Sequence, residues 1–303
     1  MGNIETYKIL QEEFLRTCNV KADSKNIRIK NPNMNIHYLE AGQGEPTILI
    51  HGGDGEASNW AQLMTYLQPD LKLYAVDRPG FGLSDPFDYK NVNLRQHAAD
   101  FVASFLDALD LKSANVIGGS MGGFFALAAT LAHPHRVNKL FLIGYAAGAT
   151  KSLPIPLKII CGVPGLAKLF MKGRDSMKAQ KNQYKGMFHT DLTKVPELLL
   201  ELRIAGIRLP SEQGTWARLL PRVANLRGIR PEIYLGDELK NITQASLMIM
   251  GQYDMATPKE GKAVMGKIPN GKFEYIPGVG HFPFVEAPEK TAEFINNFLI
   301  QSK

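Results

Sequence analysis

The stretch Gly118–Gly123 (GGSMGG) joins a strand-like apolar run, Asn115–Ile117 (NVI), to a helix predicted over Met121–Ala132. A serine among glycines between a strand and a helix is typical of a nucleophile elbow, a reversal so sharp that only small neighbours fit around the serine. The first amide groups of the helix also face developing negative charge. We therefore predict that Ser120 is a nucleophile and that the Met121 amide donates to an oxyanion. The alternative is a glycine-rich turn without chemistry.

Apolar strands alternate with helices on both sides of this elbow. The predicted strands are Ile27–Lys30, Met34–Glu40, Thr47–Ile50, Leu71–Val76, Asn115–Ile117, Lys139–Ile143, Ser246–Met250 and Lys272–Ile276. The predicted helices cover Ala57–Leu67, Leu94–Leu109, Met121–Ala132, a segment from Pro258, and Pro288–Leu299. The first two strands are joined by a turn signal and form a hairpin. Buried strands separated by helices predict an α/β fold with a mostly parallel sheet covered on both faces.

The alternation stops after Gly144 and resumes near residue 246. The stretch between is rich in proline and short apolar clusters, and it predicts helices without sheet strands. We expect residues 149–235 to form an inserted helical cap over the carboxyl edge of the sheet, where open α/β sheets keep their active sites. Residues 1–148 and 236–303 then form the α/β core, with a helical leader over residues 1–25.

A serine hydroxyl needs a base to take its proton, and the base needs an oriented imidazole. The block Gly278–Pro283 (GVGHFP) follows one predicted strand, and Gly251–Asp254 (GQYD) follows its neighbour. Both loops would lie at the carboxyl edge, and the order Ser, Asp, His is the one used by hydrolases with this elbow. We predict His281 as base and Asp254 as its orienting acid. The remaining histidines are expected on the surface or in the core: His37, His51, His97, His133, His135 and His189.

An oxyanion needs a second donor about 3 Å away. The loop His51–Gly55 (HGGDG) follows a buried strand, and its glycines let backbone amides turn inward. We predict Gly53 as that donor. The alternative for this loop is a simple tight turn.

Five blocks together resemble the α/β-hydrolase superfamily: HGG, DRPGFGLSD from Asp77, GGSMGG, GQYD and GHFPFVEAPE. The likeness runs from about Asn26 to Leu299. It implies an eight-stranded, mostly parallel sheet with a mobile cap and an acyl-enzyme mechanism. It also implies a structural role for Asp77 and Arg78. Serine at the nucleophile position differs from haloalkane dehalogenases and epoxide hydrolases, which use aspartate there.

The subfamilies differ around these blocks. HGGDG, PGFG and SMGG are similar to hydrolases that cleave carbon–carbon bonds in ring-fission products, although Phe282 replaces the tryptophan that usually follows the catalytic histidine there. Proline iminopeptidases usually have tryptophan after the serine and an acidic cap, and homoserine acyltransferases have another overall layout. We expect a serine hydrolase of a small carboxylic ester or lactone, with carbon–carbon hydrolysis of ring-fission diketones as the alternative. A ligand receptor on this fold is a third hypothesis.

Charge is unevenly distributed along the chain. The net charge is +6, yet residues 151–235 hold 15 Lys/Arg against 6 Asp/Glu, a local balance of +9. Such a segment would attract an anionic substrate, although scattered surface charge also serves solubility.

The two cysteines, Cys18 and Cys161, are too few for a disulfide framework or metal site, which suits a reducing cytoplasm. No apolar run approaches the roughly 20 residues that span a bilayer, so we expect no stable membrane insertion. We also expect no cofactor, no metal and no nucleic-acid partner, and the oligomeric state stays open. Candidate pocket walls are Trp60, Phe124, Leu153, Phe170, Met171, Met187, Phe188, Trp216 and Phe282.

Overall fold

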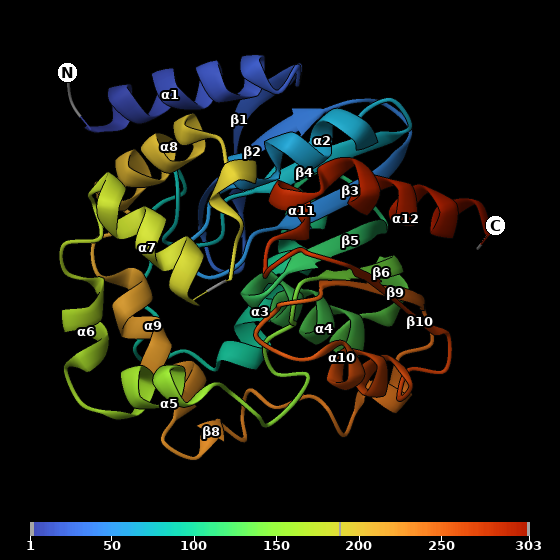
Figure 1. Ribbon diagram of the computed structural model, residues 1–303. Helices are drawn as coiled ribbons and strands as arrows, with labels where there is room; N and C mark the ends of the chain where they lie inside the picture. The colour runs from blue at the N-terminus through green and yellow to red at the C-terminus, as the bar shows by residue number, and fades with distance from the viewer. Residues whose placement is uncertain (1–2, 188, 302–303) are drawn as a thin grey trace.

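The computed structural model describes residues 3–187 and 189–301, and a single eight-stranded sheet forms its centre (Figure 1). The strand order is β1-β2-β4-β3-β5-β6-β9-β10, in which β2 runs antiparallel to β1 and β4 and the other pairs are parallel. All eight predicted runs are strands, and the mostly parallel sheet is confirmed. The strands are β1 Ala22–Ile29, β2 Met34–Ala41, β3 Glu45–Ile50, β4 Leu71–Val76, β5 Ala114–Gly119, β6 Val137–Ile143, β9 Ala245–Gly251 and β10 Gly271–Ile276.

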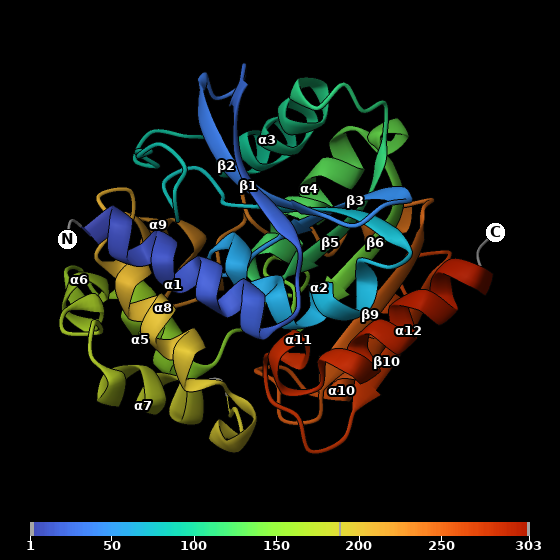
Figure 2. The ribbon, with the colours of Figure 1, turned by 90° about the horizontal axis from the view of Figure 1, so that it is seen from above.

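Helices cover both faces of this sheet, as the view from above shows (Figure 2). One face packs against α3 (Leu94–Ala108), α4 (Met121–Ala132) and α10 (Pro258–Met265), and the other against α2 (Ala61–Leu67) and α12 (Pro288–Gln301). Aromatic side chains fill the first interface, where the rings of Phe101 and Phe125 lie 5.9 Å apart. Burying apolar strands on both faces fixes their register and therefore the position of the loops at their carboxyl ends.

Among the described residues, five α-helices follow β6 before the sheet resumes at β9: α5 (Ile155–Gly162), α6 (Leu166–Met171), α7 (Met177–Met187), α8 (Glu197–Ile207) and α9 (Thr215–Val223). The expectation that this stretch lacks strands was wrong. A two-stranded hairpin joins β7 (Ala224–Asn225) to β8 (Gly228–Ile229). Turn chemistry explains it, because the Asn225 side chain accepts from the Arg227 amide at 2.8 Å and Gly228 takes φ +115°.

The N-terminal segment differs from the expected helical leader of residues 1–25. Helix α1 covers Asn3–Thr17, and β1 already begins at Ala22, five residues before the predicted start. The early part of β1 is a polar edge strand with exposed side chains, so hydrophobic periodicity could not reveal it. Helix α1 buries Tyr7 and Phe14 against α8 and thereby connects the leader to the inserted helices.

Candidate active site

Ser120 lies at the reversal between β5 and α4 with φ 51° and ψ −111°, a conformation that L residues rarely adopt. Its neighbours must be glycine. A Cβ on Gly118 would overlap the Gly122 carbonyl oxygen, and one on Gly122 would overlap the Ile50 carbonyl oxygen. This strained backbone places Ser120 at the cavity wall, and a strained reversal of this kind is typical of a nucleophile elbow.

Asp254 and His281 form a close pair at the ends of β9 and β10. His281 Nδ1 lies 2.5 Å from Asp254 Oδ1, and both side chains are buried. The carboxylate also accepts hydrogen bonds from the Tyr145 amide at 2.9 Å and the Met255 amide at 2.6 Å. These donors hold an ionised carboxylate in place, so the imidazole has one favoured orientation.

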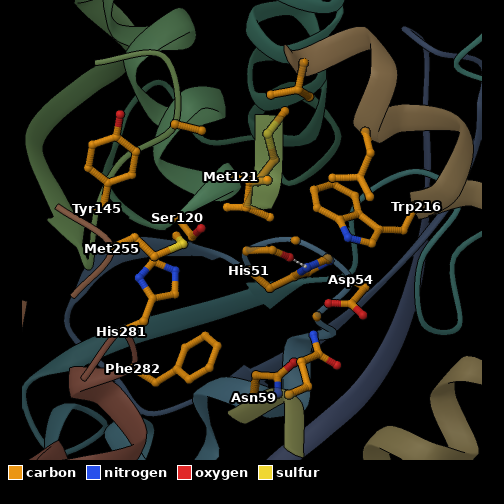
Figure 3. Close-up of a pocket in the computed structure, with 18 of the residues that line it drawn as sticks. His51, Asp54, Asn59, Ser120, Met121, Tyr145, Trp216, Met255, His281 and Phe282 are labelled. Atoms are coloured by element: carbon orange, nitrogen blue, oxygen red, sulfur yellow. Dashed lines mark hydrogen bonds between the residues drawn. The ribbon is translucent and has the colours of Figure 1, made fainter. Parts of the chain in front are cut away.

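The imidazole of His281 lies beside Ser120 at one wall of the cavity, with Trp216 at the opposite wall (Figure 3). Gly144, at the end of β6 with φ +72°, makes room for it. A Cβ there would lie 2.8 Å from the His281 carbonyl oxygen and 3.4 Å from ring atoms Cε1 and Nδ1. Three of the predicted site residues are thus brought together.

The loop after β3 is held by His51 and Arg78. His51 Nε2 accepts from the Arg78 amide at 3.0 Å, so its Nδ1 carries the proton and donates to the Gly52 carbonyl at 2.9 Å. Burial lowers the pKa of His51 well below its usual value, which keeps this ring neutral. The Arg78 guanidinium, which lies over the Phe81 ring, donates to the carbonyls of Gly52 and Gly53.

These bonds orient the predicted donor Gly53, and helix α4 places the other predicted donor, Met121. The Gly52 carbonyl points at His51 and Arg78, and in a planar trans peptide the Gly53 N–H points the opposite way. Gly53 itself lines the cavity. Met121 is the first residue of α4, so its N–H has no acceptor within the helix.

The cavity above these residues has an empty volume of about 1190 Å³, part of it open to solvent, and its walls are mainly apolar. Five of the nine candidate wall residues line it: Trp60, Leu153, Phe170, Trp216 and Phe282. Phe124 is instead buried in the core, and the Met171 sulfur accepts from Arg174. The Met187 side chain and Phe188 lie outside the described parts of the chain.

A buried charged cluster borders the cavity, and sequence reasoning missed it. The Asp54 carboxylate, in the loop after β3, contacts Arg174 and lies 3.2 Å from Arg203, which also bonds Glu56 at 2.7 Å. Burial opposes ionisation of Asp54, but the two guanidinium groups lower its pKa to about 2. Burial raises the pKa of Glu56 to about 7 and that of nearby Glu212 well above its usual value.

Within the described residues, no group of three or more His, Cys, Asp or Glu side chains could hold a metal ion. Over the same residues, no helix is both long and apolar enough to cross a membrane.

Comparison with known proteins gives a consistent family. The family model of the alpha/beta hydrolase fold matches residues 45–288. A 2-hydroxy-6-oxononadienedioate/2-hydroxy-6-oxononatrienedioate hydrolase of Dechloromonas aromatica is 27% identical over 94% of this chain and 98% of its own.

Two solved structures share the fold. Carboxylesterase CesB of Bacillus subtilis superposes with a TM-score of 0.78 at 19% identity, covering 100% of both chains. The meta-cleavage product hydrolase CumD of Pseudomonas fluorescens superposes with a TM-score of 0.74 at 23% identity, covering 92% of this chain and 98% of its own. With the family match over residues 45–288, this chain belongs to the alpha/beta hydrolase fold family and is a hydrolase.

Proposed function

We propose that this hydrolase cleaves a carbon–carbon bond next to a carbonyl group in a ring-fission product, with Ser120 as nucleophile, His281 as base and Asp254 as orienting acid. The observation that carries the mechanism is the His281–Asp254 pair beside the strained Ser120. The bond type is supported by the likeness, over nearly the full length of both chains, to the Dechloromonas hydrolase. From the sequence we expected a carboxylic ester or lactone as substrate, with carbon–carbon hydrolysis as the alternative. The proposal reverses that order.

The chemistry follows from the positions of the two histidine nitrogens. Since Nδ1 bonds Asp254, Nε2 is the atom that takes the Ser120 proton while Oγ attacks the substrate carbonyl carbon. When the substrate is in its keto tautomer, with a CH2 group next to the attacked carbonyl, the tetrahedral intermediate collapses and the carbon–carbon bond breaks. Its electron pair leaves as a conjugated dienolate that receives the proton from His281. Water, deprotonated by His281, then hydrolyses the acyl-enzyme and restores Ser120.

The oxyanion of each tetrahedral intermediate would accept from the amides of Gly53 and Met121. Both amides belong to backbone that is fixed before substrate arrives, one by the Arg78 contacts and one by α4. Preorganised donors of this kind stabilise developing charge without reorganisation during the reaction.

Residues 149–235 act in this proposal as the cap that shapes the substrate cavity. Leu153, Phe170 and Trp216 supply apolar walls, which suit the body of a hydrocarbon-rich substrate. Arg203 is the cationic side chain of this segment that lines the cavity, and a substrate carboxylate would be placed toward it.

A carboxylic ester or lactone is the second candidate, and one observation favours it. Arg203 is already paired with Asp54 and Glu56, so much of its charge is neutralised within the protein. A neutral ester needs no cation in the pocket, whereas a dienoate carboxylate gains from one.

The test compares the two bond types on one preparation. We expect the ring-fission product 2-hydroxy-6-oxo-6-phenylhexa-2,4-dienoate to be turned over with a kcat/KM at least about tenfold above that of p-nitrophenyl butyrate, and Ser120→Ala to abolish both activities. Loss of the dienol absorbance and release of p-nitrophenol are the readouts. A higher kcat/KM for the ester would assign the chain to the second candidate, and full activity of Ser120→Ala would refute the mechanism. Rapid turnover of either substrate would exclude the hypothesis that this chain is a ligand receptor.

A further inference from the structure

The outer side of the inserted segment carries an apolar patch of five exposed side chains. They are Ile155, Ile159 and Val163 on and after α5, Leu169 on α6, and Leu226 between β7 and β8. Ile155 is 71% exposed and Leu169 65%. Helix α5 contacts both α6 and β7, so the five belong to one surface. Figures 1 and 2 both place α6 at the side of the molecule opposite α12, and α5 contacts α6.

Helices α5 and α6 are apolar on two sides. Leu157 and Cys161 of α5 line the substrate cavity, while Ile155 and Ile159 of the same helix face solvent. On α6, Phe170 lines the cavity and the preceding Leu169 is exposed. A surface helix normally needs only one apolar stripe, so the outward residues indicate that something covers this side.

The segments that carry the patch also contain several cations. Lys151, Lys158, Lys168, Lys172 and Arg227 lie in the same segments. No Asp or Glu occurs between Asp110 and Asp175 in the sequence. None of these five cations forms a salt bridge with any residue that the structure describes. The positive charge is therefore not neutralised within the protein.

We propose that this face, the apolar patch with its five cations, binds the surface of an anionic phospholipid membrane peripherally. Apolar side chains among lysines match the two parts of such a surface, because the side chains enter the acyl boundary and the ammonium groups meet the headgroup phosphates. A second copy of this chain fits less well. A two-fold interface would bring the same lysines together and cost repulsion.

The position of the patch links the membrane to the active site. The helices that would touch the lipid also form cavity walls with Leu157 and Phe170. A lipophilic substrate dissolved in the membrane would therefore meet the enzyme at the segment that shapes its pocket. This consequence holds for either substrate class proposed above.

Sedimentation with sucrose-loaded vesicles tests the proposal. We expect the wild type to bind vesicles of equal parts phosphatidylcholine and phosphatidylglycerol at least about tenfold more tightly than vesicles of phosphatidylcholine alone. Binding to the anionic vesicles should weaken from about 20 to about 300 mM salt, a range in which the screening length falls steeply.

Variants separate the two components of the surface. Ile155→Ser/Leu169→Ser should weaken binding to both kinds of vesicle by about tenfold. Lys158→Gln/Lys168→Gln should lower binding to the anionic vesicles only. Ile300→Ser is the matched control, because Ile300 is 68% exposed on α12, far from the patch, and should bind like the wild type. Circular dichroism melting checks that each variant is folded.

Three results would overturn the proposal. They are absence of wild-type binding to anionic vesicles, equal loss of binding in Ile300→Ser and the patch variant, and wild-type self-association without lipid that Ile155→Ser/Leu169→Ser removes. The last result, measured by analytical ultracentrifugation, would assign the patch to a second copy of the chain. Hydrolysis of a water-soluble substrate should be unchanged in every variant, since none of the altered side chains lines the cavity.

Discussion

Each residue of the candidate triad follows a different strand of one sheet. Ser120 comes after β5, Asp254 after β9 and His281 after β10. Because parallel strands end at a common edge, an apolar run followed by a chemically capable residue was enough to predict their meeting. Their roles remain a proposal, and the geometry of the His281–Asp254 pair supports it.

The residues that hold this triad were harder to predict. The Tyr145 amide bonds Asp254 and Gly144 leaves room for the His281 ring, yet a tyrosine after a glycine at the end of β6 carries no chemical signal. Arg78 was expected to be structural, and its contacts with Gly52 and Gly53 give that role a specific form. The Tyr145 donor is a backbone amide outside the motifs that the sequence offers, and side-chain type does not mark such a donor.

Replacing the acid tests the orientation of the base. Asp254→Asn should lower kcat by about 10² to 10⁴, because an amide cannot accept from the Tyr145 and Met255 backbones and His281 together and no longer stabilises the imidazolium. Steady-state kinetics on whichever substrate is turned over gives the value. Asp237→Asn, at an exposed position, is the control. Activity within a few-fold of the wild type would show that another group orients His281.

At the scale of elements, the buried charged cluster joins the inserted helices to the sheet. Arg203 of α8 reaches Glu56 and Asp54, which are distant in sequence and follow β3. Helix α1 adds to this connection, since the Tyr7 hydroxyl oxygen lies 3.2 Å from the Ser58 hydroxyl oxygen. Contacts between segments so far apart depend on packing that periodicity does not encode, so the helices of residues 149–235 could be expected but not their arrangement.

Removing the central cation should destabilise the protein strongly. Arg203→Met leaves the buried Glu56 carboxylate without its cation and leaves the Asp54 carboxylate with Arg174 alone, and we expect a loss of about 3 to 5 kcal/mol in the free energy of unfolding. The exposed Arg208 at the end of the same helix pairs with Asp175 at 3.3 Å, and Arg208→Met should cost less than about 1 kcal/mol. Urea unfolding followed by circular dichroism measures both.

Equal losses in the two arginine variants would mean that the buried cluster contributes no more than a surface pair. If Arg203→Met instead unfolds in two steps, with the first step shifted to lower urea, the inserted helices are the part that the cluster stabilises. Arg203→Lys retains the charge but not the forked hydrogen bonds, and its stability should lie between those of Met and wild type.

Over the whole molecule, several buried groups couple stability to pH in opposite directions. Burial lowers the pKa of His97 to about 4 and that of His51 further below its usual value, so the unfolded chain binds more protons and stability rises with pH up to about 6.5. Burial raises the pKa of Glu56 and Glu212, so the folded chain binds more protons and stability falls as pH rises above about 4.5. Above about pH 6.5 the two histidines no longer contribute, and Glu56 and Glu212 continue to lower the stability as pH rises.

Glu212 gives the sharpest test of this balance. Its pKa lies well above the usual range because it is buried and close to Glu56, with Arg203 opposing the shift. We therefore expect the Tm of the wild type to fall between about pH 6.5 and 8.5, as protons held only by the folded state are lost. Glu212→Gln removes one of these groups and keeps its shape, so its Tm should fall less over the same range and exceed that of the wild type at the upper end.

The exposed Glu232→Gln is the matched control and should show the wild-type slope. Differential scanning calorimetry at a series of pH values gives all three curves. If the Tm of Glu212→Gln and that of the wild type fall equally with pH, Glu212 is ionised throughout. The Arg203 guanidinium then outweighs burial, and Glu212 adds a full negative charge to the cluster. A reduced slope would instead show that the two glutamates share a proton near neutral pH, leaving the arginines less neutralised and a substrate carboxylate more strongly attracted to Arg203.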